Sequence, residues 1–320
     1  MILVTGCAGF IGYNLALKLL NQNYKIIGVD NINNYYDRKI KEARLKNLKK
    51  FKNFIFLKKN ICNFYSLFKS LKKFKFSVVI HLAAQPGVRY SFLSPNKTLF
   101  NNLNSFNNII EIARLRNIKK FVYASSSSVY GEVKKMPFTE NDNFIKPLSI
   151  YGGSKLSNEI VADVYSRNYN LNCIGLRFFT VYGPFGRPDM AYYSFSLKNL
   201  QNKKIKLFNN SRMLRDFTYI DDVILAIEKI IKRKKFENNH EILNVGKGHP
   251  DKLIDLVLNL QKNLKKKFKI LNINSIPKGD LQKTYSSNIK IKKLLNWEPN
   301  ISLEKGVKLF VDWFLNFYKK

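Results

Sequence analysis

Cysteine and acidic side chains are scarce in this chain of 320 residues. The three cysteines, Cys7, Cys62 and Cys173, are too scattered for a disulfide framework or a zinc site, so we expect no metal and a reducing, cytoplasmic setting. No apolar run reaches the roughly 18 residues that a membrane-spanning helix needs, and we expect no membrane insertion. Residues 1–5 lack the basic flank of a signal peptide, and we interpret them as a first strand.

The shortage of acidic residues leaves a large positive charge. Only 22 Asp and Glu face 56 Lys and Arg, which gives a formal net charge of +34. Such a charge raises nucleic acid as a partner and would also attract an anionic substrate. The basic residues are dispersed in pairs, such as Lys49 with Lys50 and Lys203 with Lys204, without an arginine–aromatic motif. We interpret them as solvated faces and expect no specific nucleic-acid partner.

Short apolar runs alternate with segments of helix length through the first half of the chain. This alternation predicts an α/β fold with a doubly wound, Rossmann-type parallel sheet. Strands are expected at residues 2–5, 25–30, 54–58, 78–81, 121–125 and 173–177, and helices at 96–117, 151–169 and 303–318. We expect residues 1–177 to form a dinucleotide-binding domain. Residues 178–320 would mainly form a smaller substrate lobe, with some segments returning to the main sheet.

Three glycines follow the first strand at the start of a helical pattern. Gly6 permits a tight turn, Gly9 lets the backbone approach a pyrophosphate, and Gly12 allows close helix packing. Asp30 ends the second strand, about where a carboxylate meets an adenosine ribose and favours NAD over NADP. The pattern therefore predicts a dinucleotide site.

A tyrosine and a lysine, Tyr151 and Lys155, stand four residues apart and share one face of a predicted helix. A free tyrosine, with a pKa of about 10, is a poor base at neutral pH unless a nearby cation favours its phenolate. Lys155 supplies such a cation. The serines at 125–128 end a strand and offer a further hydroxyl to a substrate. This combination predicts proton transfer to and from an alcohol.

Small residues also follow the strand that ends at His81. Ala83 and Ala84 would let a flat nicotinamide ring approach the backbone, while His81 itself is interpreted as a packed histidine. Asn102 lies within the predicted 96–117 helix. Two roles stay open for it: a polar residue on a dimer face, or a member of the hydrogen-bond network around the site.

Together these motifs resemble the extended short-chain dehydrogenase/reductase family, and within it the UDP-glucuronate 4-epimerases. The resemblance rests on VDNINNYYD at 29–37, HLAAQPGVRY at 81–90, RFFTVYGPFGRPDM at 177–190 and RDFTYIDD at 215–222. It extends over essentially the whole chain, from residue 2 to about residue 315.

This resemblance implies redox epimerisation of a UDP-sugar with tightly bound NAD that is regenerated in each turnover. Tyr151 would take the C4 hydroxyl proton as a 4-keto sugar forms, Lys155 would bind the nicotinamide ribose, and Ser126 would bind the reacting hydroxyl. The implied NAD contacts are Gly6, Gly9, Phe10, Ile11, Gly12, Asp30, Asn31, Asn60, Ile61, Ala83, Ala84, Gln85, Asn102, Tyr151 and Lys155. The implied substrate contacts are Ser126, Ser127, Ser128, Thr180, Arg187, Arg215 and Asp280. A homodimer through helices 96–117 and 151–169 is also implied.

The serines at 127 and 128 distinguish this chain from relatives with added chemistry. Sugar-nucleotide dehydratases carry Asp-Glu before the Val-Tyr-Gly that is 129–131 here, and related decarboxylases carry a glutamate. With hydroxyls in these places, we expect the reaction to stop at epimerisation, most plausibly of UDP-glucuronate to UDP-galacturonate for surface polysaccharide. Ser127, Ser128, Thr180 and Arg187 are the candidates to hold the sugar carboxylate.

Two positions depart from the family pattern. Asn60 stands where relatives carry an aspartate near the adenine, and Pro277 stands where galactose-type epimerases carry an arginine. Lys278 is a candidate to replace that charge. Two other functions stay open: a 4-epimerase of UDP-glucose or UDP-N-acetylhexosamine, and an inert dinucleotide-binding scaffold that binds RNA.

Overall fold

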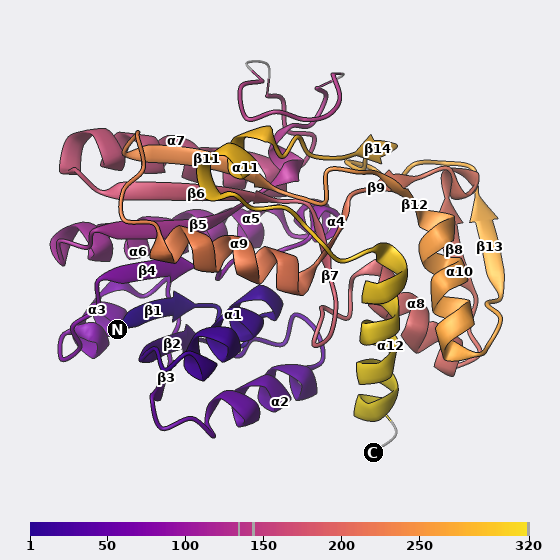
Figure 1. Ribbon diagram of the computed structural model, residues 1–320, viewed down its shortest axis with the longest axis horizontal. Helices are drawn as coiled ribbons and strands as arrows, with labels where there is room; N and C mark the ends of the chain where they lie inside the picture. The colour runs from indigo at the N-terminus through magenta and orange to yellow at the C-terminus, as the bar shows by residue number, and fades with distance from the viewer. Residues whose placement is uncertain (134, 143–144, 319–320) are drawn as a thin grey trace.

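The computed structural model describes residues 1–133, 135–142 and 145–318, and its centre is a seven-stranded parallel sheet (Figure 1). The strand order is β11–β6–β5–β4–β1–β2–β3. The strands are β1 (Ile2–Thr5), β2 (Ile26–Asp30), β3 (Phe54–Lys58), β4 (Val78–His81), β5 (Lys120–Ser126), β6 (Asn172–Phe178) and β11 (His240–Val245). The order runs outward from β1 in both directions, which confirms the predicted doubly wound sheet. The division after residue 177 into two domains stays a prediction.

Both faces of the sheet are covered, because side chains along a strand point alternately to opposite faces. Val4 and Ile26 belong to one core cluster, whereas their neighbours Leu3 and Ile27 belong to another. On the first face lie α1 (Phe10–Asn21), α2 (Arg38–Leu48), α9 (Ile220–Lys232) and α11 (Ile289–Leu295), and on the second lie α3 (Phe64–Leu71), α6 (Ser105–Leu115) and α7 (Ile150–Tyr169).

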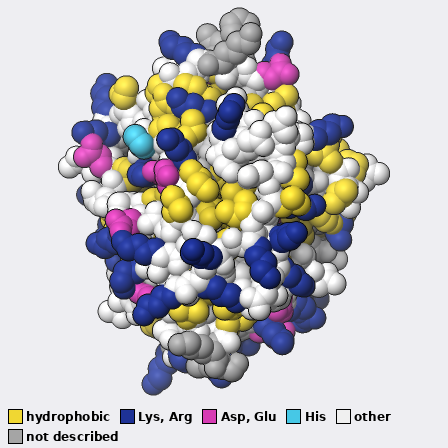
Figure 2. All heavy atoms as spheres, turned by 90° about the vertical axis from the view of Figure 1, so that its right-hand side faces the viewer, with side chains coloured by type: hydrophobic (Ala, Val, Ile, Leu, Met, Phe, Trp, Pro, Cys, Tyr) yellow, Lys and Arg dark blue, Asp and Glu magenta, His cyan; other side chains and the backbone are white. Residues whose placement is uncertain are grey.

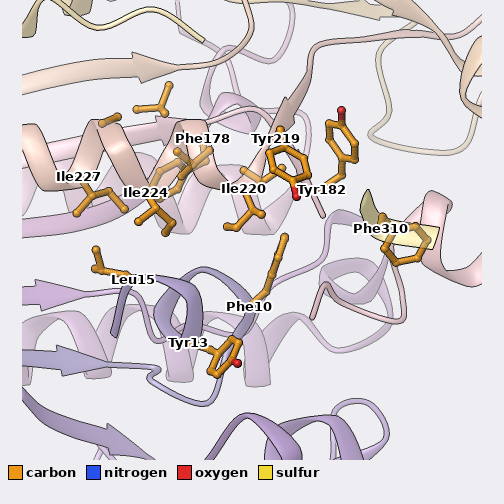
Figure 3. Close-up of a cluster of buried hydrophobic side chains, with 14 of the residues drawn as sticks. Phe10, Tyr13, Leu15, Phe178, Tyr182, Tyr219, Ile220, Ile224, Ile227 and Phe310 are labelled. Carbon is orange, nitrogen blue, oxygen red and sulfur yellow. The ribbon is translucent and has the colours of Figure 1, made fainter. Parts of the chain in front are cut away.

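Helix α1 packs directly against α9 on the first face. Figure 3 shows Phe10 of α1 opposite Ile220 of α9, and Leu15 opposite Ile227. These side chains are at most 5% exposed. Because α1 follows the glycine loop directly, this packing fixes the position of that loop.

The predicted helix at 96–117 forms over residues 95–115 and contains a π-helical turn. It consists of α5 (Pro95–Leu99), a π-helical turn (Phe100–Asn104) and α6. The predicted helix is therefore confirmed, but the π-helical turn inside it was not predicted, because apolar periodicity does not reveal one added residue in a turn. Such π turns often occur at functional sites, and this one carries Asn102.

Helix α7 has clear boundaries. The Ser149 side chain accepts a hydrogen bond from the Gly152 backbone N–H at 3.0 Å, which caps the first turn. Asn170 ends the helix in the left-handed conformation, with φ of 50°. Tyr151 and Lys155 therefore lie in the first two turns, beside the end of β5.

The later part of the chain forms smaller units beside the sheet, on the right in Figure 1. They contain α8 (Ala191–Leu200), α10 (Leu253–Leu264), α12 (Leu303–Tyr318), β7 (Thr180–Tyr182), β8 (Ile205–Phe208), β9 (Leu214–Arg215), β10 (Phe217–Tyr219), β12 (Asp251–Lys252), β13 (Ile270–Ile273) and β14 (Lys283–Thr284). The short helix α4 (Val88–Leu93) comes earlier in the chain, between β4 and α5. The small sheets pair β10 with β7, β13 with β8, and β9 with both β12 and β14. Among the residues described, no helix has the length and apolar character to cross a membrane.

Candidate active site

A cavity of about 770 Å³ lies between the carboxyl ends of the sheet strands and the smaller units. Ligands of open α/β sheets bind at this edge. Every site residue predicted from the sequence lines the cavity, except Asn102 and the candidate cation Lys278. The lining members are Gly6, Gly9, Phe10, Ile11, Gly12, Asp30, Asn31, Asn60, Ile61, Ala83, Ala84, Gln85, Ser126, Ser127, Ser128, Tyr151, Lys155, Thr180, Arg187, Arg215 and Asp280.

The glycine loop forms one end of the cavity, and its shape excludes larger side chains. A Cβ at Gly12 would lie 2.1 Å from the Gly6 carbonyl oxygen, and a Cβ at Gly6 would lie 2.8 Å from the Ala83 nitrogen. Gly6 also has a positive φ of 71°, which favours glycine. The backbone of the loop therefore stays open to a ligand at the start of α1.

The Asp30 carboxylate lies beside this loop and is held by backbone groups. Oδ2 accepts a hydrogen bond from the Ala8 N–H at 3.1 Å, and Oδ1 accepts one from the Ile32 N–H at 2.8 Å. A carboxylate oxygen accepts two hydrogen bonds, so each keeps a lone pair for a ligand hydroxyl. This geometry suits a ribose diol.

Asn102 lies behind the cavity wall and is 1% exposed. Its Oδ1 accepts a hydrogen bond from the Gln85 N–H at 2.7 Å, and its Nδ2 donates to the Gln85 carbonyl at 3.2 Å and to Ser154 Oγ at 2.9 Å. The side chain thus joins the loop after β4 to helix α7. Asn102 supports the wall and does not face the cavity.

Tyr151 and Lys155 meet near the middle of the cavity. Lys155 Nζ lies 6.0 Å from the centroid of the Tyr151 ring and donates a hydrogen bond to the Ala124 carbonyl at 2.9 Å. Burial lowers the pKa of Lys155 to about 8, against the opposing effect of the Glu159 carboxylate. The ammonium keeps two further N–H groups for a ligand.

Burial also raises the pKa of Tyr151 above its usual value. The Arg187 guanidinium and, more weakly, the Ser126 hydroxyl act in the opposite direction. Arg187 is thus a second cation beside the phenol, in addition to the lysine expected from the sequence.

The serines at the end of β5 have two different surroundings, the buried Glu159 on α7 for Ser125 and the cavity for Ser126, Ser127 and Ser128. The Ser125 hydroxyl donates to the buried Glu159 carboxylate, which is also paired with Arg177 at 2.7 Å. The Ser126 oxygen accepts the Ser128 N–H at 3.1 Å. Ser126, Ser127 and Ser128 therefore form a hydroxyl-rich wall, while Ser125 ties the strand to α7.

Arg187 lies in the loop before α8 and lines the same cavity. It forms two hydrogen bonds with the Asp189 carboxylate, Nε to Oδ1 at 3.1 Å and Nη2 to Oδ2 at 2.5 Å. Asp189 also accepts a hydrogen bond from the Tyr35 hydroxyl at 3.2 Å. Thr180, at the start of β7, and Arg187 both line the cavity.

The far end of the cavity contains two arginines and one carboxylate. Arg89 pairs with Asp280 at 3.2 Å and lies over the Phe208 ring at 5.0 Å from its centroid. Burial lowers the pKa of Arg215, Asp280 opposes this effect, and Arg89 reinforces it. The predicted substitute cation, Lys278, lies over Phe92 and does not line the cavity. Arg89 supplies the second positive charge instead.

A buried arginine connects the two ends of the cavity. Arg44 on α2 is 0% exposed, and its Nη1 donates to the Ala8 carbonyl at 2.7 Å. Its Nη2 donates to the Phe185 carbonyl at 2.6 Å and the Gly186 carbonyl at 2.9 Å. The glycine loop and the loop that carries Arg187 are therefore joined by one side chain.

Sequence reasoning missed Tyr35, Arg44, Arg89 and Asp189. Three of them lie inside the stretches that carried the family resemblance, at 29–37, 81–90 and 177–190, but no local pattern assigned them a partner. The signal available was only the presence of a charged or phenolic side chain in each stretch. Within the described part of the chain, no three His, Cys, Asp or Glu side chains are placed to hold a metal ion.

Comparison with known proteins gives concordant matches. Residues 2–246 match the model of the NAD dependent epimerase/dehydratase family. Protein CapI of Staphylococcus aureus is 41% identical over 334 residues, covering 100% of this chain and 99% of the relative. UDP-glucuronate 4-epimerase 4 of Arabidopsis thaliana is 38% identical over 333 residues, covering 99% and 76%. The crystal structure of UDP-glucuronic acid 4-epimerase from Bacillus cereus, in complex with UDP-glucuronic acid and NAD, superposes with a TM-score of 0.91 at 34% identity and covers 99% of each chain.

Proposed function

The chain belongs to the NAD dependent epimerase/dehydratase family, and we propose that this NAD-dependent UDP-sugar 4-epimerase interconverts UDP-glucuronate and UDP-galacturonate. The observation that carries the uronate assignment is the set of donors that line the cavity together with Tyr151. It combines the hydroxyls of Ser127 and Ser128 with the Arg187 guanidinium, and all three residues line the cavity. A carboxylate is recognised by such hydrogen-bond donors and a cation.

The cofactor end fits NAD. The glycine loop leaves the backbone open at Gly6 and Gly12, where a Cβ would collide with neighbouring backbone, and Asp30 keeps free acceptors for a ribose. When bound, NAD supplies reversible oxidation and reduction at the sugar C4. Lys155 would hold the ribose next to the nicotinamide with its remaining N–H groups.

Tyr151 is the proposed base for the C4 hydroxyl. Its phenol lies beside Ser126, which would orient the reacting hydroxyl, and the Arg187 guanidinium lowers its pKa. Lys155 Nζ lies 6.0 Å from the centroid of the same ring. After the 4-keto sugar turns over in the cavity, Tyr151 would return the proton to the new C4 oxygen. Serines at 127 and 128 provide no carboxyl acid or base for dehydration.

The far end of the cavity is proposed to hold the diphosphate. Arg215 and Arg89 both line it, from β9 and from α4. Guanidinium groups suit phosphate oxygens, with which they form paired hydrogen bonds. Asp280 would keep Arg89 oriented through its 3.2 Å ion pair.

The direct test is turnover of a panel of UDP-sugars by the purified protein without added NAD. We expect conversion of UDP-glucuronate to UDP-galacturonate, identified by NMR from the C4 stereochemistry and the retained C6. Acceptance of UDP-glucose or UDP-N-acetylglucosamine with no turnover of any UDP-uronate would reject the uronate assignment and favour the neutral-sugar alternative.

A homodimer through the helices on the second face is also proposed. Ile160 and Val164 of α7 are 60% and 43% exposed, and Leu115 of α6 is 44% exposed. Exposed apolar side chains on adjacent helices are typical of an interface. Sedimentation should give a dimer that Ile160→Lys converts to a monomer, whereas Ile289→Lys, at a 79% exposed position elsewhere, should leave the dimer intact.

For the cell, we propose that this enzyme works in the cytoplasm and supplies UDP-galacturonate for a surface polysaccharide. Loss of galacturonate from the polysaccharide after deletion of the gene would support this role. RNA binding has less support, because Figure 2 shows Lys and Arg side chains dispersed between hydrophobic and uncharged ones on the face it presents. Salt-dependent RNA binding that UDP-sugar leaves unchanged would favour the scaffold alternative.

A further inference from the structure

Arg187 is held by a chain of polar contacts that starts in a distant part of the sequence. Tyr35 precedes α2 and donates its hydroxyl to Asp189 Oδ2 at 3.2 Å, and Asp189 binds Arg187 through two hydrogen bonds. The Asp189 pair uses Nε and Nη2 of the guanidinium. Nη1 is therefore left to donate to a ligand in the cavity that all three residues line.

The position of Tyr35 is itself fixed by packing. Its ring meets the Tyr90 ring edge-on at 5.1 Å between centroids, and a Cβ at Gly87 would lie 2.7 Å from the Tyr35 oxygen. Gly87 has a φ of 111°, a conformation that favours glycine. The loop after β4 thus leaves the space in which the Tyr35 hydroxyl reaches Asp189.

Charge couples the same groups. Burial raises the pKa of Asp189, but the charge and hydrogen bonds of Arg187, together with hydrogen bonds from the backbone and from Tyr35, leave this pKa below its usual value. Arg187 in turn lowers the pKa of Tyr151. The same guanidinium therefore acts electrostatically on both the Asp189 carboxylate and the proposed catalytic phenol.

We propose that Asp189, held by Tyr35, is a positioning residue that fixes the Arg187 guanidinium so that the 4-keto uronate is epimerised without losing its carboxylate. This inference rests on the proposed function and concerns the same cavity. Asp189 and Tyr35 would thus determine whether the product is epimerised or decarboxylated, although neither contacts the reacting atoms.

The chemical reason lies in the 4-keto intermediate, which is a β-keto acid. Decarboxylation breaks the C5–C6 bond, whose electron pair moves into the C4 carbonyl to give an enolate while C6 leaves as carbon dioxide. The bond breaks readily only when it stands perpendicular to the carbonyl plane. A guanidinium of fixed orientation can hold the carboxylate away from that geometry, whereas a mobile one cannot.

The Asp189 contact also moderates the charge of Arg187. A bare guanidinium would bind the carboxylate tightly and oppose the turning of the keto sugar that epimerisation needs. Paired with Asp189, Arg187 presents directional N–H donors with a smaller net charge. Loss of Asp189 should therefore affect both the partition of the intermediate and the apparent affinity for the substrate.

The test is product analysis of Asp189→Asn and Tyr35→Phe with UDP-glucuronate. For Asp189→Asn we expect at least a tenfold rise in the ratio of decarboxylated 4-keto pentose to UDP-galacturonate, measured by NMR, with NADH accumulating on the enzyme because the released product cannot reoxidise it. Tyr35→Phe should raise the ratio less, because Arg187 keeps its carboxylate partner. Matched controls are Asp312→Asn, from an exposed ion pair with Lys308 at 2.8 Å, and Tyr65→Phe, at an 84% exposed position.

A merely structural role would lower all rates together and leave the product ratio unchanged, so an unchanged ratio in both variants overturns the inference. If Asp189→Asn does not fold, as judged by thermal melting, Tyr35→Phe decides alone. Absence of UDP-glucuronate turnover by the unaltered enzyme would instead overturn the proposed function, and this inference with it.

Discussion

The two ends of the cavity are built in different ways. At the cofactor end, backbone defines the site: glycines at 6, 9 and 12 keep neighbouring backbone in close contact, and backbone N–H groups hold Asp30. At the substrate end, side chains from distant segments hold one another, as in the pairs of Asp189 with Arg187 and of Asp280 with Arg89. The proposed cofactor site thus rests mainly on backbone contacts, and the proposed sugar-nucleotide site rests on pairs of side chains.

Tyr151 stands where the two ends meet, and its loss should have the largest effect. Tyr151→Phe removes the proton acceptor, for which general acid–base catalysis accounts for about 10²- to 10⁴-fold in rate. We expect a fall in kcat of about 1,000-fold, with bound NAD retained. Steady-state kinetics and NAD content measure both, and Tyr169→Phe, on the same helix and 52% exposed, is the control. A variant that keeps more than a tenth of its activity would remove Tyr151 from the mechanism.

A single added methyl group should abolish NAD binding at the cofactor end. In Gly12→Ala the new Cβ would meet the Gly6 carbonyl oxygen at 2.1 Å, so the loop or α1 must shift. We expect the purified variant to have lost at least nine-tenths of its bound NAD, measured after acid release. Gly153→Ala introduces the same methyl on α7, where nothing lies within 4 Å, and should retain NAD. Equal NAD contents in the two variants would contradict a site defined by backbone contact.

The substrate end should respond to loss of one side chain in a graded way. Arg89→Met removes a proposed phosphate contact, and hydrogen bonds to charged groups are worth about 1.5 to 3 kcal/mol. We expect KM for the UDP-sugar to rise about tenfold with kcat nearly unchanged. Arg38→Met, from an exposed pair with Glu42 at 3.7 Å, is the control. A fall in kcat at constant KM would place Arg89 in the chemistry and not in binding.

His81 sharpens the comparison through pH. It ends β4 behind the cofactor end, its Nδ1 lies 2.8 Å from Thr5 Oγ1, and burial lowers its pKa to about 3, with the Lys155 charge acting in the same direction. Below pH 6.5 the His81 imidazole binds a proton in the unfolded state but not in the folded state. The contribution of His81 to the free energy of unfolding is therefore fully present above pH 6.5 and declines as the pH falls toward 3.

From pH 6.5 to pH 5.5 this histidine should contribute a loss of about 1 kcal/mol in the free energy of unfolding. Denaturant titrations at both pH values measure it. His81→Asn should lose that component of the pH dependence, while His249→Asn, whose side chain is 72% exposed, should keep it. The same pH dependence in both variants would assign the effect to other groups.

The difference between the cofactor end and the substrate end of the cavity also explains which parts of the site can be predicted from the sequence. The sheet and the glycine loop follow from local patterns, because the turn at Gly6 and the alternation along each strand depend on near neighbours. The pairing of Tyr35 with Asp189 joins residues 154 positions apart, and Arg44 reaches carbonyls 141 and 142 positions away. Only the folded chain brings such partners together. The π-helical turn at Asn102 could not be predicted either, because one extra residue in a turn barely changes the apolar periodicity.

The central claim is that C4 is oxidised and reduced within one cavity while the uronate stays whole. The most direct measurement uses UDP-glucuronate labelled with deuterium at C4, without added NAD, followed by NMR. The account predicts UDP-galacturonate with deuterium retained at C4 and C6 intact. Product that has lost the C4 deuterium to solvent, or product lacking C6, would contradict it.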